Sequence, residues 1–333
     1  MTYWRPIPMT DPFRPKDAER LAGGWCWFDR IERMTRAGDR YIAAFSEVPT
    51  HIMERLIAPR MPIAAMTMDR PRIMGILNVT PDSFSDGGMF NTPDAAVAQA
   101  RAMVEDGADI IDIGGESTRP GATPVDIAEE KRRTVPVIAA IRAEHRVPIS
   151  IDTRNAPVAQ AALEAGATLV NDVSGFLHDT SMQQTVAQAG APCCLMHSIK
   201  TPETMQDDPF SAYEDVVFDV YDHLAACVTL AERAGIRRDQ IMVDPGIGFG
   251  KTLEHNLALL KNLSLFHGLG CAVLLGASRK RFIGTLGNVS EAKERMPGSV
   301  AVALHGVRQG VQILRVHDTP ETRQALSLHM AVN

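Results

Sequence analysis

The feature that most constrains the fold of this chain is a repeat in which short apolar segments alternate with longer amphipathic ones. From residue 72 onward, eight segments have the length and aliphatic content of buried strands: residues 73–78, 110–114, 147–151, 169–172, 193–196, 241–243, 272–275 and 313–316. The segments between them predict helices at residues 93–105, 124–144, 156–165, 181–188, 211–234, 253–263 and 297–309. Strands that alternate with helices in this way predict a parallel sheet covered by helices.

Eight strands are the number that closes a barrel, and the chain after residue 70 has the length of a typical barrel of about 250 residues. The alternative is an open, doubly wound sheet, which would carry a GxGxxG turn after its first strand. The chain reads NVTPDSFSDGG there instead. We therefore predict an α/β fold, a (β/α)₈ TIM barrel over residues 71–333 with an N-terminal extension over residues 1–70.

The extension does not share the repeat of the barrel. It contains all three tryptophans, Trp4, Trp25 and Trp27, and begins with a proline-rich segment. Helices are plausible around residues 29–36 and 50–57. Its composition indicates no function.

Composition and charge exclude several classes of protein. The net charge is −6, and the 34 basic and 40 acidic residues form no long runs, so we expect no nucleic-acid partner and a small-molecule substrate instead. The N-terminus has charges and prolines where a secretory signal needs an apolar core, and no apolar run is long enough to span a membrane. The five cysteines show no zinc-like CxxC pairing. We expect a cytoplasmic protein with reduced cysteines.

Polar side chains follow the predicted strands, at the face where such barrels carry their active sites. Loop residues are often polar, and Asp or Ser there often caps the next helix. The excess of amides and carboxylates at the strand ends themselves is harder to explain structurally. One group is Asp152, Asn171, Asp244 and Lys280, which suits a flat heterocycle with donors and acceptors on its edge. The alternative for Asp152 or Asp244 is a helix cap or a buried ion pair with Lys280.

A second group of strand-end residues suits an oxyanion. Arginine binds diphosphate in a bidentate manner, and an amide oxygen beside a diphosphate is a suitable ligand for Mg²⁺, which keeps most of its waters. The residues are Asn78, Arg119, Arg279, Arg315 and His317. The segment GIGFGK at 246–251 lacks the spacing of a phosphate-binding loop, so its glycines fit close approach to a planar ligand better. Phe249 is either a wall for that ligand or a core residue.

Taken together, the motifs of this chain resemble those of one family. The segments GILNVTPDSFSDGG, ADIIDIGGESTRPGA, ISIDTRN, LVNDVSG, LMH, DPGIGFGK, GASRKRFIG and RVHD occur in the order typical of the dihydropteroate synthases, across about three quarters of the chain. The resemblance implies a TIM barrel that joins p-aminobenzoate to 6-hydroxymethyl-7,8-dihydropterin diphosphate in folate biosynthesis. It also implies Mg²⁺ as cofactor and a homodimer.

Residue roles follow from the resemblance, motif by motif. It implies catalytic groups at Asp152, Lys280, Arg315 and His317. The implied pterin site is Asp152, Asn171, Met196, Asp244, Phe249 and Lys280. The diphosphate would be held by Asn78, Thr118, Arg119, Arg315 and His317, with Asn78 also meeting Mg²⁺. The aminobenzoate site would be Phe84, Pro120, Ser278 and Arg279.

One departure from the family pattern follows LMH, where residues 198–200 stand in place of a glycine; Lys200 either reaches a phosphate or lies in solvent. Two rival functions remain open. A corrinoid-dependent pterin methyltransferase would not need the SRK and RVHD motifs. A non-catalytic pterin-binding paralogue would not need the intact oxyanion-seeking residues.

The sequence lacks the insertion beside SRK that marks sulfonamide-insensitive relatives. We therefore expect sulfonamides to compete with p-aminobenzoate. Steady-state rates at varied drug and aminobenzoate concentrations check this; turnover unchanged by saturating drug at limiting aminobenzoate would contradict it.

Overall fold

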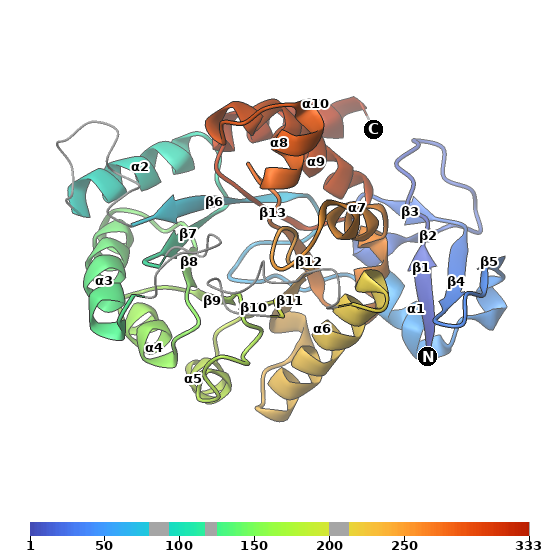
Figure 1. Cartoon of the computed structure of the whole chain (residues 1–333), viewed down its shortest axis with the longest axis horizontal. Coiled ribbons are helices and arrows are strands. Elements are labelled where there is room, and N and C mark those ends of the chain that lie inside the picture. The colour runs from blue at the N-terminus through green and yellow to red at the C-terminus, as the bar shows by residue number, and fades with distance from the viewer. Residues whose placement is uncertain (80–92, 117–124, 200–212, 333) are drawn as a thin grey trace.

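A computed structural model describes residues 1–79, 93–116, 125–199 and 213–332 (Figure 1). Eight parallel strands close into a barrel in the order β10-β11-β12-β13-β6-β7-β8-β9, which confirms the predicted fold. The strands are β6 Arg72–Asn78, β7 Ile110–Gly114, β8 Ile149–Asp152, β9 Leu169–Asp172, β10 Cys193–Met196, β11 Ile241–Asp244, β12 Ala272–Leu275 and β13 Ile313–Val316. Strand β8 begins two residues later than predicted, after Pro148, which has no N–H to donate to a sheet.

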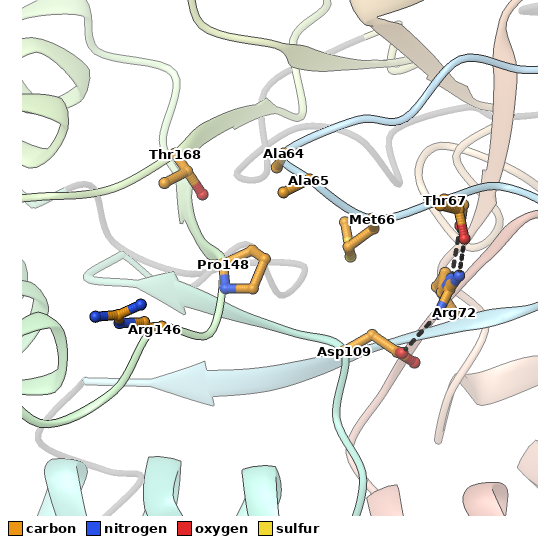
Figure 2. Close-up of a pocket in the computed structure, with 9 residues that line it drawn as sticks. All are labelled: Ala64, Ala65, Met66, Thr67, Arg72, Asp109, Arg146, Pro148 and Thr168. Atoms are coloured by element: carbon orange, nitrogen blue, oxygen red, sulfur yellow. Dashed lines mark hydrogen bonds and ion pairs between the residues drawn. The ribbon is translucent and has the colours of Figure 1, made fainter.

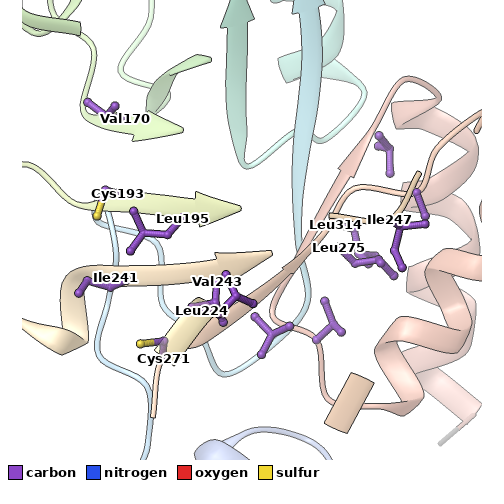
Figure 3. Close-up of a cluster of buried hydrophobic side chains, with 14 of the residues drawn as sticks. Val170, Cys193, Leu195, Leu224, Ile241, Val243, Ile247, Cys271, Leu275 and Leu314 are labelled. Atoms are coloured by element: carbon purple, nitrogen blue, oxygen red, sulfur yellow. The ribbon is translucent and has the colours of Figure 1, made fainter. Parts of the chain in front are cut away.

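Successive strand side chains point alternately into the barrel and out toward the helices. One set fills the amino-terminal half of the interior, where Met74, Ile110, Leu169 and Met242 pack together. The outward set packs under the helices, as Figure 3 shows for Val170, Leu195, Val243 and Leu314, with Leu224 of helix α6 among them. The inward positions farther along the strands, at their carboxyl ends, form the mouth of the barrel.

The helices around the barrel are close to the predicted ones. They are α2 Pro93–Glu105, α3 Ile127–Glu144, α4 Ala156–Glu164, α5 Met182–Ala189, α6 Val216–Arg233, α7 Leu253–Lys261, α8 Arg281–Gly287, α9 Met296–Arg308 and α10 Thr319–Val332. Helices α3 and α6 begin later than predicted because Asp126 and Asp215 cap them, each accepting from two backbone N–H groups. Helices α8 and α10 were not predicted. No helix in the described ranges has the length and apolar content to cross a membrane.

The extension contains a small antiparallel sheet of β1 Thr2–Pro6, β4 Ile31–Thr35 and β5 Arg40–Ala43, a pair β2 Glu19–Arg20 and β3 Trp27–Phe28, and helix α1 Thr50–Ile57. Helix α1 confirms the prediction for residues 50–57. The predicted helix at 29–36 is wrong. Strand β4 lies there between two partners, and a turn in which the N–H of Gly38 donates to Thr35 O reverses the chain into β5. Sheet pairing on both sides therefore outweighs the local helix preference.

The extension is fixed to the side and to the amino-terminal end of the barrel. The ring of Tyr3 stacks on Phe218 of α6 at a centroid distance of 4.1 Å, and its hydroxyl donates to Asp222 at 2.8 Å. The indole of Trp25 donates to Val307 O at the end of α9. Ile63 and Met68 pack with the inner barrel layer. Residues of the extension thus pack into the core of the barrel. The domain boundary at residue 70 stays a prediction.

Candidate active site

The carboxyl-terminal mouth of the barrel gathers the polar residues predicted to bind ligand. Asn78, Gly114, Asp152 and Asn171 are register partners in successive strands, and Met196 is the partner of Asp244. A Cβ on Gly114 would lie 3.6 Å from both Asn78 Oδ1 and Asp152 Cβ. Asn78 and Asp152 therefore flank one glycine.

Asp244 and Arg315 flank a second glycine, Gly276, which directly follows β12. A Cβ there would lie 3.3 Å from Asp244 Oδ2 and 3.8 Å from Arg315 Cδ. Large side chains at these two glycines would fill the space between the polar groups. The glycines therefore keep the mouth open toward the carboxylates.

Arg315 links two carboxylates inside the barrel. Its Nε donates to Asp112 Oδ2 and its Nη2 to Asp152 Oδ2, both at 2.6 Å. Asn171 Nδ2 also donates to Asp112, at 3.3 Å. Asp112 is completely buried and lies one layer below the mouth. It therefore orients two of the predicted ligand-binding residues, although the sequence reasoning missed it.

Burial controls the protonation of the carboxylates. Desolvation raises the pKa of Asp152 to about 7, although the nearby Arg315 lowers it. Desolvation also raises the pKa of Asp244, against the effect of Lys280. Within the described part of the chain, Asp152 Oδ1 and Asp112 Oδ1 are buried without a hydrogen-bond partner. Such groups are costly unless a ligand satisfies them, so Asp152 is an acceptor available to a ligand.

Lys280 and Phe249 lie together beside this mouth, as the sequence suggested. Lys280 Nζ donates to Ile247 O and lies 4.2 Å from the centroid of the Phe249 ring. Desolvation lowers the pKa of Lys280 to about 7, and the charge of Asp244 partly offsets this. An ammonium with this pKa, next to an aromatic face and two carboxylates, can donate to a heterocycle carbonyl or ring nitrogen.

Ser278, Arg279 and His317 form the rim beyond Lys280. His317 Nδ1 lies 3.0 Å from Ser278 Oγ, and the backbone N–H of His317 donates to the same oxygen. Arg279 has a φ of 58°, which few non-glycine residues adopt. Its guanidinium forms an ion pair with Asp318, and its backbone N–H donates to Ser299 Oγ at 2.8 Å. The Arg279 side chain is therefore already partnered.

The predicted site residues divide into two sets. The structure brings together those on the strands and on the loops after β11 and β12: Asn78, Asp152, Asn171, Met196, Asp244, Phe249, Ser278, Arg279, Lys280, Arg315 and His317. The expectations for Phe84, Thr118, Arg119, Pro120 and Lys200 concern residues outside the described ranges. Asp112 carried a signal that was overlooked, an isolated carboxylate inside the apolar strand IIDIG.

Metal ligands are sparse at the mouth. No group of three or more His, Cys, Asp or Glu side chains in the described ranges is arranged to hold a metal ion. Asn78 is half-buried at the end of β6. A single amide oxygen fits Mg²⁺ only as one ligand among waters and substrate phosphate oxygens, which is how this ion is usually held with phosphate substrates.

A separate cavity of about 510 Å³ lies at the opposite, amino-terminal end of the barrel (Figure 2). The segment 64–67 lines one side of this cavity, and Pro148 and Thr168 line the other. Its buried charges are already paired, since Arg72 bonds to Thr67 and forms ion pairs with Asp69 and Asp109. Figure 2 shows Arg146 on the far side of Pro148 from Arg72, so the cations do not converge. This cavity is not the candidate active site.

A parallel barrel with ionisable side chains at the carboxyl ends of its strands is the architecture of a (β/α)₈-barrel enzyme. The sequence model of a family described as pterin binding enzyme matches residues 74–317. A dihydropteroate synthase of Clostridium beijerinckii is 45% identical over 261 residues, 78% of this chain and 93% of that protein.

Two solved structures support the same relationship. The dihydropteroate synthase of Xanthomonas albilineans with 4-aminobenzoic acid has a TM-score of 0.77 and 44% identity, covering 82% of this chain and 98% of that one. The Yersinia pestis dihydropteroate synthase with a sulfonamide drug has a TM-score of 0.77 and 42% identity over the same shares. The chain therefore belongs to the pterin-binding enzymes and, within them, to the dihydropteroate synthase family.

Replacing Asp112 by Asn tests whether this carboxylate holds Arg315. The change keeps the volume but removes one charge from a buried pair, so we expect a loss of about 3 kcal/mol in the free energy of unfolding. The matched control is Glu144→Gln, which breaks the exposed pair with Arg101 and should cost little. Urea unfolding followed by circular dichroism measures both. Equal effects of the two variants would contradict a structural role of Asp112.

Proposed function

We propose that this protein joins p-aminobenzoate to 6-hydroxymethyl-7,8-dihydropterin diphosphate, with release of diphosphate, as a step of folate biosynthesis. The observation that carries the proposal is the group of Asp152, Asn171, Asp244 and Lys280 at the mouth of a barrel of this family. These groups offer buried acceptors and one half-buried ammonium to a flat ligand.

In the proposed complex, the pterin lies in the mouth with its N–H edge toward the carboxylates. Asp152 Oδ1 is the unsatisfied acceptor, and Asp244 and Asn171 take the neighbouring positions. Lys280 donates to the carbonyl side of the ring. Met196 and Phe249 supply apolar contacts to its faces. All these roles require that the carboxylates are ionised when the pterin is bound.

The diphosphate lies toward the rim in this proposal. Arg315 uses Nε and Nη2 for Asp112 and Asp152, so Nη1 is the atom it offers to an oxyanion. His317 lies beside Ser278 on the same rim. By family resemblance, Thr118 and Arg119 complete the diphosphate site, while Phe84, Pro120, Ser278 and Arg279 hold the aminobenzoate. Asn78 would be the protein ligand of Mg²⁺, which when bound neutralises charge on the diphosphate.

The chemical step is a substitution at the methylene carbon of the pterin. The C–O bond breaks, and its electron pair leaves with the diphosphate, while the amino nitrogen of p-aminobenzoate bonds to the carbon and then loses a proton to water. Asp152 and Asp244 favour the positive charge that develops on the pterin methylene, and Arg315 stabilises the leaving group. An arylamine needs no strong base, so orientation and exclusion of water are the remaining contributions of the protein.

We also propose a homodimer in the cytoplasm. The dimer rests on family resemblance alone, and light scattering at micromolar concentration tests it. All five cysteines are buried free thiols, which suits a reducing compartment.

The direct test of the proposed reaction measures diphosphate release from 6-hydroxymethyl-7,8-dihydropterin diphosphate, with p-aminobenzoate and Mg²⁺ each added or withheld. We expect release only when both are present, with an equal amount of dihydropteroate formed. Tight pterin binding without release would instead favour the methyltransferase or the non-catalytic paralogue.

The raised pKa of Asp152 predicts a pH dependence of pterin binding. In the free protein this carboxyl gains a proton as the pH falls below about 7, whereas the bound pterin requires the carboxylate. Affinity for 6-hydroxymethylpterin should therefore fall by up to about tenfold per pH unit between pH 7 and pH 5. As the pH falls from 7 to 5, Lys280 becomes more fully protonated, so the loss of affinity does not come from a weaker hydrogen bond donated by Lys280. Fluorescence titration of wild type and Asp152→Asn measures this; an unchanged slope in the variant would refute the assignment.

A further inference from the structure

Lys251 is a buried lysine that the proposed chemistry does not use. It lies at the end of the loop between β11 and α7, and only 4% of its surface is exposed. Its Nζ donates to Gly246 O and Phe249 O, both at 2.9 Å, and lies 3.0 Å from His197 Nδ1. The backbone oxygen of His197 is a further, longer acceptor at 3.4 Å, so each of the three ammonium protons has a partner. No carboxylate in the described ranges forms an ion pair with it.

The loop that Lys251 closes has little stiffness of its own. Gly246, Gly248 and Gly250 have φ values of 68°, 81° and 59°, in the region that glycine adopts most easily. A Cβ on Gly246 would lie 2.0 Å from His197 O, so the loop is pressed onto the end of β10. The ammonium ties two carbonyls of the loop to each other and to His197. These hydrogen bonds of the Lys251 ammonium therefore restrict a loop whose three glycines would otherwise leave it flexible.

The outer side of the same loop faces the proposed pterin site. Ile247 O accepts a hydrogen bond from Lys280, and the Phe249 ring packs against the Lys280 ammonium. Lys251 itself does not reach the mouth. Its two acceptors in the loop are Gly246 O, directly before Ile247, and the carbonyl of Phe249 itself. The tie therefore determines where Ile247 presents its carbonyl and Phe249 its ring.

The cost of this arrangement argues that it is more than packing. Burial lowers the pKa of Lys251 well below its ordinary value, and the charge of Lys280 adds to this effect. Removing a charge from water is costly, and no carboxylate in the described ranges forms an ion pair that would offset this cost for Lys251. The pKa of His197 is also well below its ordinary value, because of burial and the nearby Lys251, so its Nδ1 is available as an acceptor.

We propose that Lys251 is a positioning residue that holds the loop 246–251 so that Ile247 O and Phe249 orient Lys280 for the pterin. The role rests on the proposed function, because the loop is taken as a wall of the pterin site. A buried ammonium that only stabilises the fold is the competing interpretation.

The test compares Lys251→Met with Lys261→Met, a lysine exposed in the last turn of α7. We expect the KM for the pterin diphosphate to rise about tenfold in Lys251→Met, while the KM for p-aminobenzoate stays within about twofold. Lys261→Met should match wild type. A Lys251→Met variant with both KM values unchanged, or with a lower kcat alone, would overturn the proposal in favour of a structural role.

A second pair of variants keeps the test decisive if Lys251→Met does not fold. His197→Asn retains an oxygen near the position of Nδ1, whereas His197→Leu removes this acceptor and leaves only the more distant His197 O, at 3.4 Å, besides the two loop carbonyls. We expect His197→Leu to raise the pterin KM severalfold and His197→Asn to remain within about twofold of wild type. Equal behaviour of the two would overturn the proposal.

Binding of 6-hydroxymethylpterin, followed by fluorescence, separates this proposal from the proposed function. If wild type binds no pterin, both are wrong. If wild type binds pterin and Lys251→Met binds it equally well, only the positioning role is wrong. Weaker binding by Lys251→Met supports the role even in a protein that forms no dihydropteroate.

Discussion

The bonds from Arg315 to Asp112 and Asp152 join the interior of the barrel to its mouth. They bring a guanidinium and two carboxylates into a space where few waters are available, and each charge depends on the others for its solvation. Because Asp112 is on β7, Asp152 on β8 and Arg315 on β13, the network forms only when the barrel is closed. The site therefore forms because the barrel closes, and no single loop creates it.

The rest of the mouth is arranged around that network. Asn171 shares Asp112 with Arg315, and Gly114 and Gly276 leave room for a ligand between the polar groups. On the far side, Lys280 rests on the loop that Lys251 ties together. The Arg315 network and the loop tied by Lys251 both use buried charge to fix flexible groups before the ligand binds. This lowers the entropic cost of binding a rigid heterocycle.

The sequence predicted the barrel because its strand and helix periods are local signals that repeat. It also predicted Asp152, Asn171, Asp244 and Lys280, since polar residues at strand ends converge in any parallel barrel. It did not predict the role of Asp112, because nothing local shows that a carboxylate in the middle of an apolar strand meets an arginine about two hundred residues later. Strand β4 was mistaken for a helix because its pairing with β1 and β5, which fixes it as a strand, is not visible in its own residues.

The proposed function requires that the carboxylates at the carboxyl-terminal mouth recognise the pterin. A crystal structure of the protein with 6-hydroxymethylpterin tests it most directly. We expect the pterin in the mouth, with its N–H edge on Asp152 and Asp244 and with Lys280 at its carbonyl side. Pterin bound at the amino-terminal cavity beside Arg72 and Asp109, or in the mouth without contact to Asp152, would contradict it.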